Sequence, residues 1–186
     1  MRRTDSKWIL AKKYEFPNLL KAIITQQYTT IFLFTLRKME YHYSKGGSHK
    51  LQYIFWHWVW AHWSLKTGLT IPKNVAEYGL TLYHYGSIVV NANCKIGKHC
   101  CIMNNVNIGA NGGSPAAPMI GQNVYIGPGA VLYGDISIAD GCYIGANAVV
   151  NKSFSTPNSV IVGVPAKVVG YDEVPWWKKN GLNRKN

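Results

Sequence analysis

This 186-residue sequence contains four cysteines, whose side chains could bind a metal or act in catalysis: Cys94, Cys100, Cys101 and Cys142. Thiolates can bind zinc or act as nucleophiles, but cysteine zinc sites usually contain C-x-x-C pairs, and the sequence has none. We therefore expect no metal site, and we expect free thiols in a reducing cytoplasm.

Charge is the second chemical feature. The chain has 20 Lys and Arg against 8 Asp and Glu, a net charge of +12. Residues 1–77 hold 12 of the basic and 4 of the acidic residues, whereas residues 78–170 hold only 4 and 2. A basic excess suggests a polyanionic partner, but no nucleic-acid recognition motif is present, so we expect no nucleic acid. No apolar run predicts a spanning helix, and residues 1–16 do not resemble a secretory signal.

The middle of the chain repeats an aliphatic residue at every sixth position. Ten positions at this spacing, from 96 to 150, contain nine aliphatic residues; the exception, Ser114, lies in a Gly- and Pro-containing loop. The residue two positions earlier is small, branched or Pro outside that loop. A period of six fits neither an α-helix nor a heptad, but it fits a parallel β-helix with three flat faces. Both series then point inward, and Gly or Asn forms the corners.

The same period assigns the cysteines to places in the coil. Cys94, Cys100 and Cys142 fall in the inward series, so we expect small buried hydrophobic residues there. Cys101 is out of phase and is expected at the surface, where no neighbouring residue indicates a catalytic thiol.

Several segments resemble the hexapeptide-repeat acyltransferases, in the branch of serine acetyltransferases and their relatives in capsule and exopolysaccharide clusters. They are LYHYGSIVV (82–90), VNIGANGG (106–113), VYIGPGAVLYGDISI (124–138), YIGANAVV (143–150) and VGVPAKVVG (162–170). The resemblance implies a left-handed parallel β-helix in a mainly β chain, and acetyl-CoA as donor. It also implies a homotrimer whose neighbouring subunits form the active site. We assign residues 1–68 to an N-terminal helical region, 69–170 to the β-helix and 171–186 to a tail that caps the coil.

The resemblance makes His84 the catalytic base. A neutral imidazole can take the proton of an acceptor hydroxyl as it attacks a thioester. The alternative is a structural histidine at the edge of the coil. Family members also have an Asp fifteen residues before this His, where the present chain has Leu69. Glu77 or a backbone carbonyl could orient the imidazole instead.

The acceptor side of the site departs further from serine acetyltransferases. Their R-H-P-K-I segment, which helps to bind serine, corresponds to Ala117, Pro118, Met119 and Ile120. A free amino acid has a carboxylate that requires a cation, so the missing Arg and His argue against serine. Nearby polar residues could instead contact acceptor hydroxyls, or the asparagines could form a ladder inside the coil. These residues are Tyr85, Asn104, Asn105 and Asn107.

The donor side is closer to the family pattern. Small residues at the corners would allow the pantetheine arm to approach the backbone, although simple corner geometry also explains the glycines. Lys152 and Lys167 would suit the CoA phosphates. The resemblance assigns Gly109, Ala110, Gly127, Pro128, Gly145, Ala146, Lys152, Gly163, Ala166 and Lys167 to acetyl-CoA.

The N-terminal third lacks the six-residue period. Residues 17–43 are predicted to be helical, Gly46 and Gly47 to break the helix, and residues 49–67 to form a second, Trp-rich segment. This region could be a helix–helix core with a solvated basic face. It could also stack sugar rings or contact an anionic, lipid-linked glycan at the inner face of the membrane.

These observations predict an acetyl-CoA-dependent O-acetyltransferase that acts on a hydroxyl of a sugar or polysaccharide precursor, in the cytoplasm or peripherally at the inner membrane. One alternative is the serine O-acetyltransferase of cysteine biosynthesis. Another is a non-catalytic β-helix assembly subunit.

Overall fold

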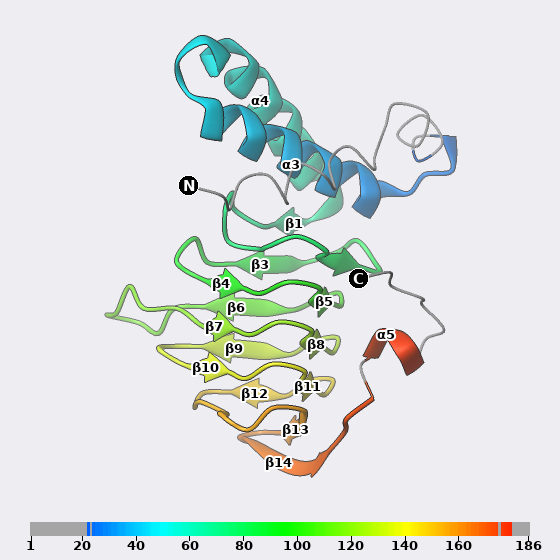
Figure 1. Cartoon of the computed structure of the whole chain (residues 1–186), viewed down its shortest axis with the longest axis vertical. Coiled ribbons are helices and arrows are strands. Elements are labelled where there is room, and N and C mark those ends of the chain that lie inside the picture. The colour runs from blue at the N-terminus through cyan, green and yellow to red at the C-terminus, as the bar shows by residue number, and fades with distance from the viewer. Residues whose placement is uncertain (1–21, 23, 175, 180–186) are drawn as a thin grey trace.

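The computed structural model of the chain describes residues 22, 24–174 and 176–179. A pair of helices covers one end of a coil of short strands, and the chain after the coil returns along its side (Figure 1). The parallel coil and the N-terminal helices agree with the fold expected from the sequence.

The helical pair consists of α3 (Tyr28–Lys45) and α4 (Lys50–Thr67), with the 3-10 turn η1 (Gly47–His49) between them. Gly46 and Gly47 both have positive φ, 58° and 39°, which confirms the predicted break. The first helix was expected from residue 17, and residues 22 and 24 are indeed helical. The helix is interrupted at Gln26, whose φ of 54° lies outside the helical region, and α3 begins at Tyr28. Residues 17–21 and 23 of that expectation lie outside the described residues.

Fourteen short strands follow, and most contain two or three residues. They are β1 (Leu69–Thr70), β2 (Thr81–Leu82), β3 (Ile88–Val90), β4 (Lys95–Ile96), β5 (Cys101–Ile102), β6 (Asn107–Gly109), β7 (Met119–Ile120), β8 (Tyr125–Ile126), β9 (Val131–Tyr133), β10 (Ser137–Ile138), β11 (Tyr143–Ile144), β12 (Val149–Val150), β13 (Ser159–Gly163) and β14 (Ala166–Tyr171). They form three sheets in the orders β1-β3-β6-β9-β12, β10-β7-β4 and β14-β13-β11-β8-β5-β2. All recorded strand pairs are parallel except β13 with β14.

The pairing register confirms three faces of six residues each. Ile126 pairs with Ile144, eighteen residues later, so one coil takes eighteen residues. Ile102 pairs with Ile126, twenty-four residues later, which is six residues more than one regular coil. The extra residues lie in the loop between β6 and β7, which projects from the coil in Figure 1. Ser114, the one exception to the aliphatic series, is exposed in this loop.

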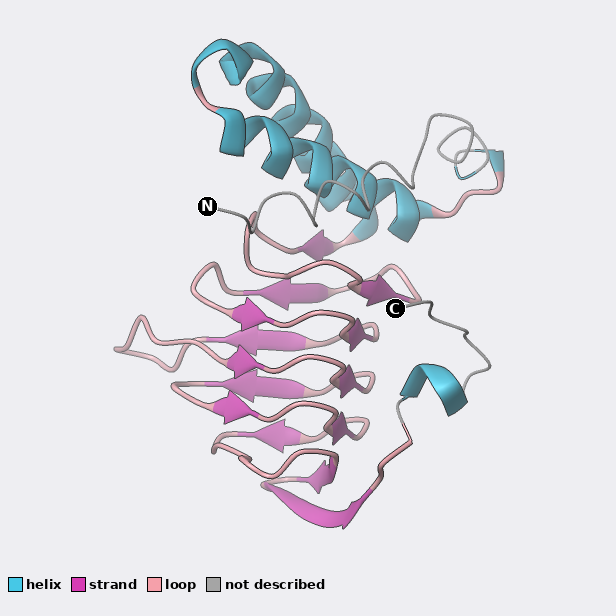
Figure 2. Cartoon of the chain, in the orientation of Figure 1, coloured by secondary structure: helices cyan, strands magenta, loops and turns pink. Residues whose placement is uncertain are grey.

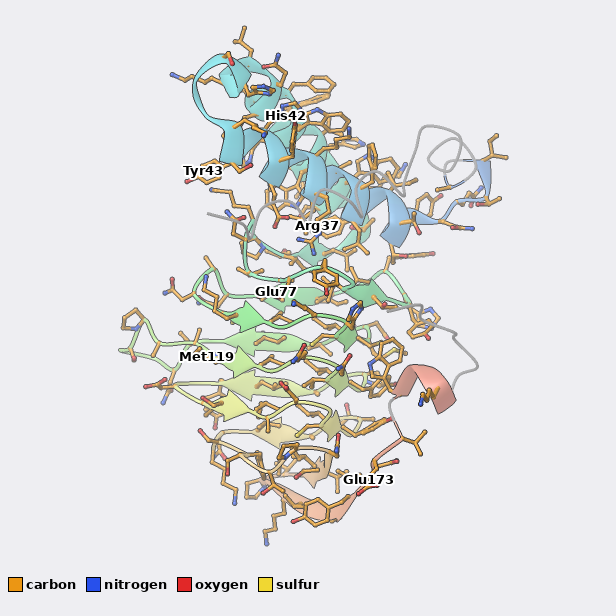
Figure 3. The ribbon with its side chains drawn as sticks, in the orientation of Figure 1. Arg37, His42, Tyr43, Glu77, Met119 and Glu173 are labelled. Atoms are coloured by element: carbon orange, nitrogen blue, oxygen red, sulfur yellow. The ribbon has the colours of Figure 1, made fainter. Side chains whose placement is uncertain are left out.

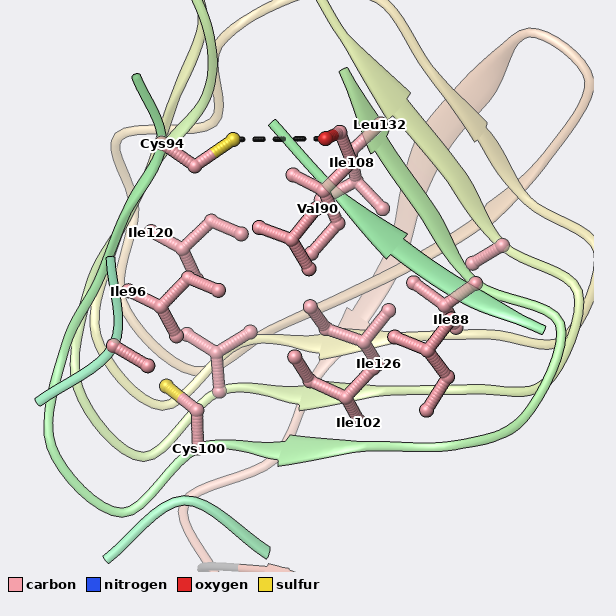
Figure 4. Packing of buried hydrophobic residues seen from close by; sticks show 14 of the residues in the cluster. Ile88, Val90, Cys94, Ile96, Cys100, Ile102, Ile108, Ile120, Ile126 and Leu132 are labelled. Atoms are coloured by element: carbon pink, nitrogen blue, oxygen red, sulfur yellow. Dashed lines mark hydrogen bonds between the residues drawn. The ribbon is translucent and has the colours of Figure 1, made fainter. Parts of the chain in front are cut away.

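The aliphatic series fills the axis of the coil. Its nine members are at most 4% exposed, and Figure 4 shows several of them meeting at the centre. Burial of each such side chain contributes about 2 kcal/mol, so this column is the main stabilising element of the coil. The Sγ atom of Cys94 lies in the same core and donates to the carbonyl oxygen of Ile108 at 3.6 Å. Cys100 and Cys142 are also buried, as the period predicts.

Helix α3 closes the first coil. Phe32, Leu36 and Met39 join the core cluster that runs through the coil. Arg37 donates to the carbonyl oxygens of Ala76 and Glu77 at 2.9 and 2.7 Å (Figure 3). The carboxylate of Glu40 pairs with Arg37 at 2.6 Å, and it also accepts the backbone N–H of Asn74 at 2.7 Å. This buried ion pair fixes the helix to the first turn of the coil.

The described part of the tail lies along the side of the coil and not over its base, contrary to the expectation that residues 171–186 cap the coil. The short helix α5 (Trp176–Lys179) lies beside the coil, as Figure 2 shows. Trp176 is 1% exposed, and its ring lies 6.3 Å from that of Tyr83 and 6.2 Å from that of Tyr125. The hydroxyl of Tyr143 donates to the carbonyl oxygen of Val174 at 2.7 Å.

The returning tail also explains why the expectation for Cys101 was wrong. Cys101 pairs with Thr81 and Tyr125 on the outer ladder of its sheet, yet it is fully buried. We infer that Trp176, packed on Tyr125, covers this outward-facing thiol.

The coil spacing can be tested at Gly97. A Cβ atom there would lie 2.6 Å from backbone atoms of Gly121 in the next coil, which cannot move aside easily. We expect Gly97→Ala to lower the free energy of unfolding by about 1–3 kcal/mol in urea denaturation followed by circular dichroism. Gly112→Ala is the matched control, because nothing lies within 4 Å of its Cβ position and neither glycine has a positive φ. Equal losses in the two variants would contradict the close stacking.

The cover over Cys101 can be tested by alkylation with iodoacetamide. Burial raises the pKa of the Cys94 thiol to about 11, so that thiol stays protonated at mildly alkaline pH. Because all four thiols are buried, we expect slow labelling of the native wild type. Trp176→Ala should make Cys101 alone reactive, as identified by mass spectrometry of labelled peptides, whereas Trp58→Ala on α4 should not. An unchanged labelling rate of Cys101 in the Trp176 variant would contradict its assigned cover.

Candidate active site

His84 lies in the turn between β2 and β3, at one corner of the coil, and its side chain is exposed. The turn is tied to the end of α4. Gly68 ends that helix with a left-handed φ of 72°. The carbonyl oxygens of Thr67 and Gly68 then accept the N–H groups of Gly86 and Ile88 at 2.9 and 3.1 Å. The helical pair therefore holds the backbone that carries the imidazole.

Within the described part of the chain, the imidazole of His84 has no hydrogen bond or ion pair. The backbone carbonyl of Glu77 accepts Arg37, and its N–H donates to Ile96 at another corner (Figure 3). Glu77 therefore does not orient His84 in this structure. Leu69 is fully buried and pairs with Ile88, so its side chain belongs to the core. An orienting group has to come from elsewhere.

Below His84, the corners of successive coils stack directly on one another. The position of a Cβ atom on Gly86 would lie 3.7 Å from Cβ of Asn104. The carbonyl oxygen of Asn104 accepts the N–H of Gly129 at 3.0 Å, and that of Pro128 accepts the N–H of Asn147 at 2.9 Å. The turn of His84 thus continues downward as a single column of corners.

Glycines allow the corners of this column to stack closely on one another. A Cβ atom on Gly127 would lie 2.8 Å from the backbone nitrogen of Ala146, and one on Gly145 would lie 2.7 Å from Cγ1 of Val162. Gly163 follows Val162, so it ends the same column. The structure therefore brings together one group of predicted site residues, which we call the His84 corner: His84, Asn104, Gly127, Pro128, Gly145, Ala146 and Gly163.

A second group lies at the next corner along the chain. Gly109 ends β6, and its carbonyl oxygen accepts the N–H of Gly134 at 3.1 Å. Ala110 begins the projecting loop. Lys152 follows β12, and its Nζ atom lies 5.6 Å from the centre of the Phe154 ring. The sheet β1-β3-β6-β9-β12 separates this group, the Gly109 corner, from the His84 corner.

Two donor-side residues lie on the last strand. Ala166 pairs with Gly163 and is buried in the core, so only its backbone can meet a ligand. Lys167 pairs with Val162 and is exposed near the lower end of the His84 corner. Lys152 and Lys167 therefore lie at different corners, and one chain does not gather them around one phosphate group.

The predicted acceptor residues have different surroundings. Asn105 has a φ of 59°, a conformation that asparagine tolerates, so the turn itself accounts for it. Asn107 is exposed at the start of β6, between the two corners. Tyr85 is exposed, and its ring meets that of Tyr28 edge-on at 5.5 Å. Sequence reasoning missed Tyr28 because nothing in the local pattern links it to His84.

A cation also lies behind this tyrosine pair. The Nζ atom of Lys66 is 5.6 Å from the ring centre of Tyr28 and 4.9 Å from that of Trp63. The segment that corresponds to the serine-binding motif has no such charge: Ala117 and Pro118 are buried, and Met119 is exposed on the outer face of β7 (Figure 3). Among the described residues, no three His, Cys, Asp or Glu side chains gather as a metal site requires.

Comparison with known proteins shows which proteins the coil is similar to. Residues 117–152 match the family described as bacterial transferase hexapeptide (six repeats). The serine acetyltransferase of Mycobacterium tuberculosis is 32% identical over 132 residues, which cover 63% of this chain and 57% of that protein. The probable serine acetyltransferase 2 of Oryza sativa subsp. japonica is 32% identical over 146 residues, covering 70% and 41%.

Solved structures agree with these matches. The crystal structure of serine acetyltransferase in complex with coenzyme A from Brucella abortus aligns with a TM-score of 0.63 and 29% identity. The alignment covers 75% of this chain and 54% of that chain. The chain spans about half the length of the curated relatives it matches. Together with the six-residue register and the stacked glycine corners, these similarities show that the coil resembles the hexapeptide-repeat transferases, with the family match itself confined to residues 117–152.

Proposed function

We propose that the chain is an O-acetyltransferase that uses acetyl-CoA as donor and His84 as general base. The observation that carries the proposal is the exposed imidazole of His84 above a column of close-packed glycine corners. The similarity to a serine acetyltransferase solved with coenzyme A supports the donor.

The chemistry follows from one base and a thioester. His84 takes the proton of the acceptor hydroxyl while the hydroxyl oxygen forms a bond to the acetyl carbon. Backbone N–H groups at the corners stabilise the negative charge that develops on the carbonyl oxygen. The carbon–sulfur bond then breaks, and the imidazolium returns its proton to the departing CoA thiolate. The hydroxyl becomes an ester and no covalent enzyme intermediate forms.

The separation of the two corners supports a site shared between copies of the chain. Within one chain, the His84 corner and the Gly109 corner lie on opposite sides of a sheet. Copies placed side by side can bring one corner of each to the same groove. We propose the homotrimer of left-handed coils that the resemblance implies, with Lys152 and Lys167 reaching the CoA phosphates from different copies.

For the acceptor we propose serine, because the comparisons favour this alternative over a sugar hydroxyl. The relatives described above are named serine acetyltransferases, and they give no support to a polysaccharide role. A second candidate is a hydroxyl compound without a carboxylate. The buried Leu69 and Ala117 favour it, because serine acetyltransferases have an Asp in the first of these segments and an Arg-His pair in the second.

The role of His84 predicts the effect of its removal. We expect His84→Ala to lower kcat by at least about a hundredfold, because general-base catalysis is lost. Binding of CoA, measured by calorimetry, should stay within a factor of two or so, since the imidazole acts on the acceptor. His62→Ala, an exposed histidine on α4, is the matched control and should keep full activity. An unchanged kcat in the His84 variant would overturn the assignment.

The acceptor can be identified by measuring CoA release, corrected for hydrolysis, with L-serine, nucleotide sugars and oligosaccharides. We expect L-serine to be acetylated with the highest kcat/KM. A sugar with a higher kcat/KM than L-serine would establish the second candidate, because an acceptor without a carboxylate does not need the missing cation. No turnover with any acceptor, together with no binding of CoA, would instead support the non-catalytic assembly subunit.

A further inference from the structure

The outer face of α4 is largely apolar, interrupted by the exposed His62, and nothing in the described structure covers it. Five large apolar side chains point outward along it. They are Leu51, Ile54, Phe55, Trp58 and Leu65, with exposed fractions of 79%, 54%, 55%, 68% and 87%. Their spacing of three, four and seven residues places them on one side of the helix. We call this set the α4 stripe.

The inner face of the same helix is apolar too, and it is already occupied. Trp56, Trp60 and Trp63 are partly buried against the core. The rings of Phe34 and Trp56 meet edge-on at 5.7 Å, which joins α4 to α3. The helix–helix core, one of the two roles that the sequence left open for this region, therefore describes the inner face of α4. A helix that is apolar on both sides normally has both sides covered, and α3 covers only one.

The charge around the stripe has a single sign. Between residues 24 and 67 the only acidic residue is Glu40, which is buried and paired with Arg37. Exposed Lys50 and Lys66 lie at the two ends of α4, next to the first and last residues of the stripe. An apolar face of Leu, Ile, Phe and Trp bordered by lysines is the pattern of helices that lie in the surface of an anionic membrane.

We propose that α4 docks the protein on the surface of an anionic lipid bilayer. The stripe enters the boundary between headgroups and acyl chains, and Lys50 and Lys66 meet lipid phosphates. The contact is peripheral, because among the described residues no helix has the length and apolar character to cross a membrane. A second copy of the chain fits less well, because α4 has no carboxylate to pair with the lysines of another α4.

The position of the stripe leaves the rest of the molecule free. The helical pair lies at the end of the coil opposite β14 (Figure 1). The two corners of the candidate active site run along the sides of the coil, so they stay open when α4 lies on a membrane. This docking role does not depend on the proposed enzymatic activity.

Flotation of the full chain with lipid vesicles tests the proposal. We expect wild type to float with vesicles of equimolar phosphatidylglycerol and phosphatidylcholine, and much less with phosphatidylcholine alone. Raised salt should weaken the binding. The double variant Phe55→Ser/Trp58→Ser should lower the partition coefficient at least about tenfold, because the two aromatic side chains of the stripe are lost.

The matched control is Val169→Ser/Tyr171→Ser, which removes two equally exposed apolar side chains from β14 and should float like wild type. Circular dichroism checks that both variants fold, and sedimentation equilibrium measures their mass. Equal flotation with both vesicle types, or none with either, would overturn the proposal. So would a fall in mass of the Phe55/Trp58 variant without any flotation of wild type, because the stripe would then join copies of the chain.

Discussion

The rest of the structure depends on how closely successive coils stack. Each strand pairs with the equivalent strand of the next coil, eighteen residues later in the regular coils, so the corners must pass over one another at backbone distance. Gly97 meets the backbone of Gly121, and Gly127 meets that of Gly145, with no room for a Cβ atom. This constraint selects glycine at these corners, and the narrow axis selects aliphatic or other small apolar side chains at the inward positions. Between them, these two choices account for the repeat and for the low charge of residues 78–170.

The same stacking determines what a ligand can meet. Because side chains at the corners are small or absent, a ligand that lies along the coil contacts backbone N–H and carbonyl groups. Chemistry that needs a side chain must come from the irregular parts, and His84 is in the first coil, where Thr81 pairs with Cys101 twenty residues later. The corner of His84 and the corner of Gly109 are separated by a sheet. The proposed assembly follows from this separation, because only a second chain can complete the groove.

The sequence predicted the parts of the structure that depend on local order. The six-residue period was enough to place Cys94 and Cys142 in the core, because phase alone decides which way a strand residue points. It was not enough for Cys101, whose burial depends on Trp176 returning from a distant part of the chain. The contact between Tyr28 and Tyr85 is equally non-local. For the candidate site, the sequence pattern proposed the residues but could not predict their division between two corners.

The charge of the chain also divides along structural lines. The coil has few cations. The two lysines that we assign to the donor, Lys152 and Lys167, are exposed at separate corners. Among the described residues, the helical pair carries five further cations, Arg37, Lys38, Lys45, Lys50 and Lys66. This pair ends at Gly68 and holds the turn of His84 through the carbonyls of Thr67 and Gly68. A rigid helix whose outer face can meet a membrane therefore ends at the backbone of the proposed base. The helical pair therefore positions the turn of the proposed base as well as covering the coil.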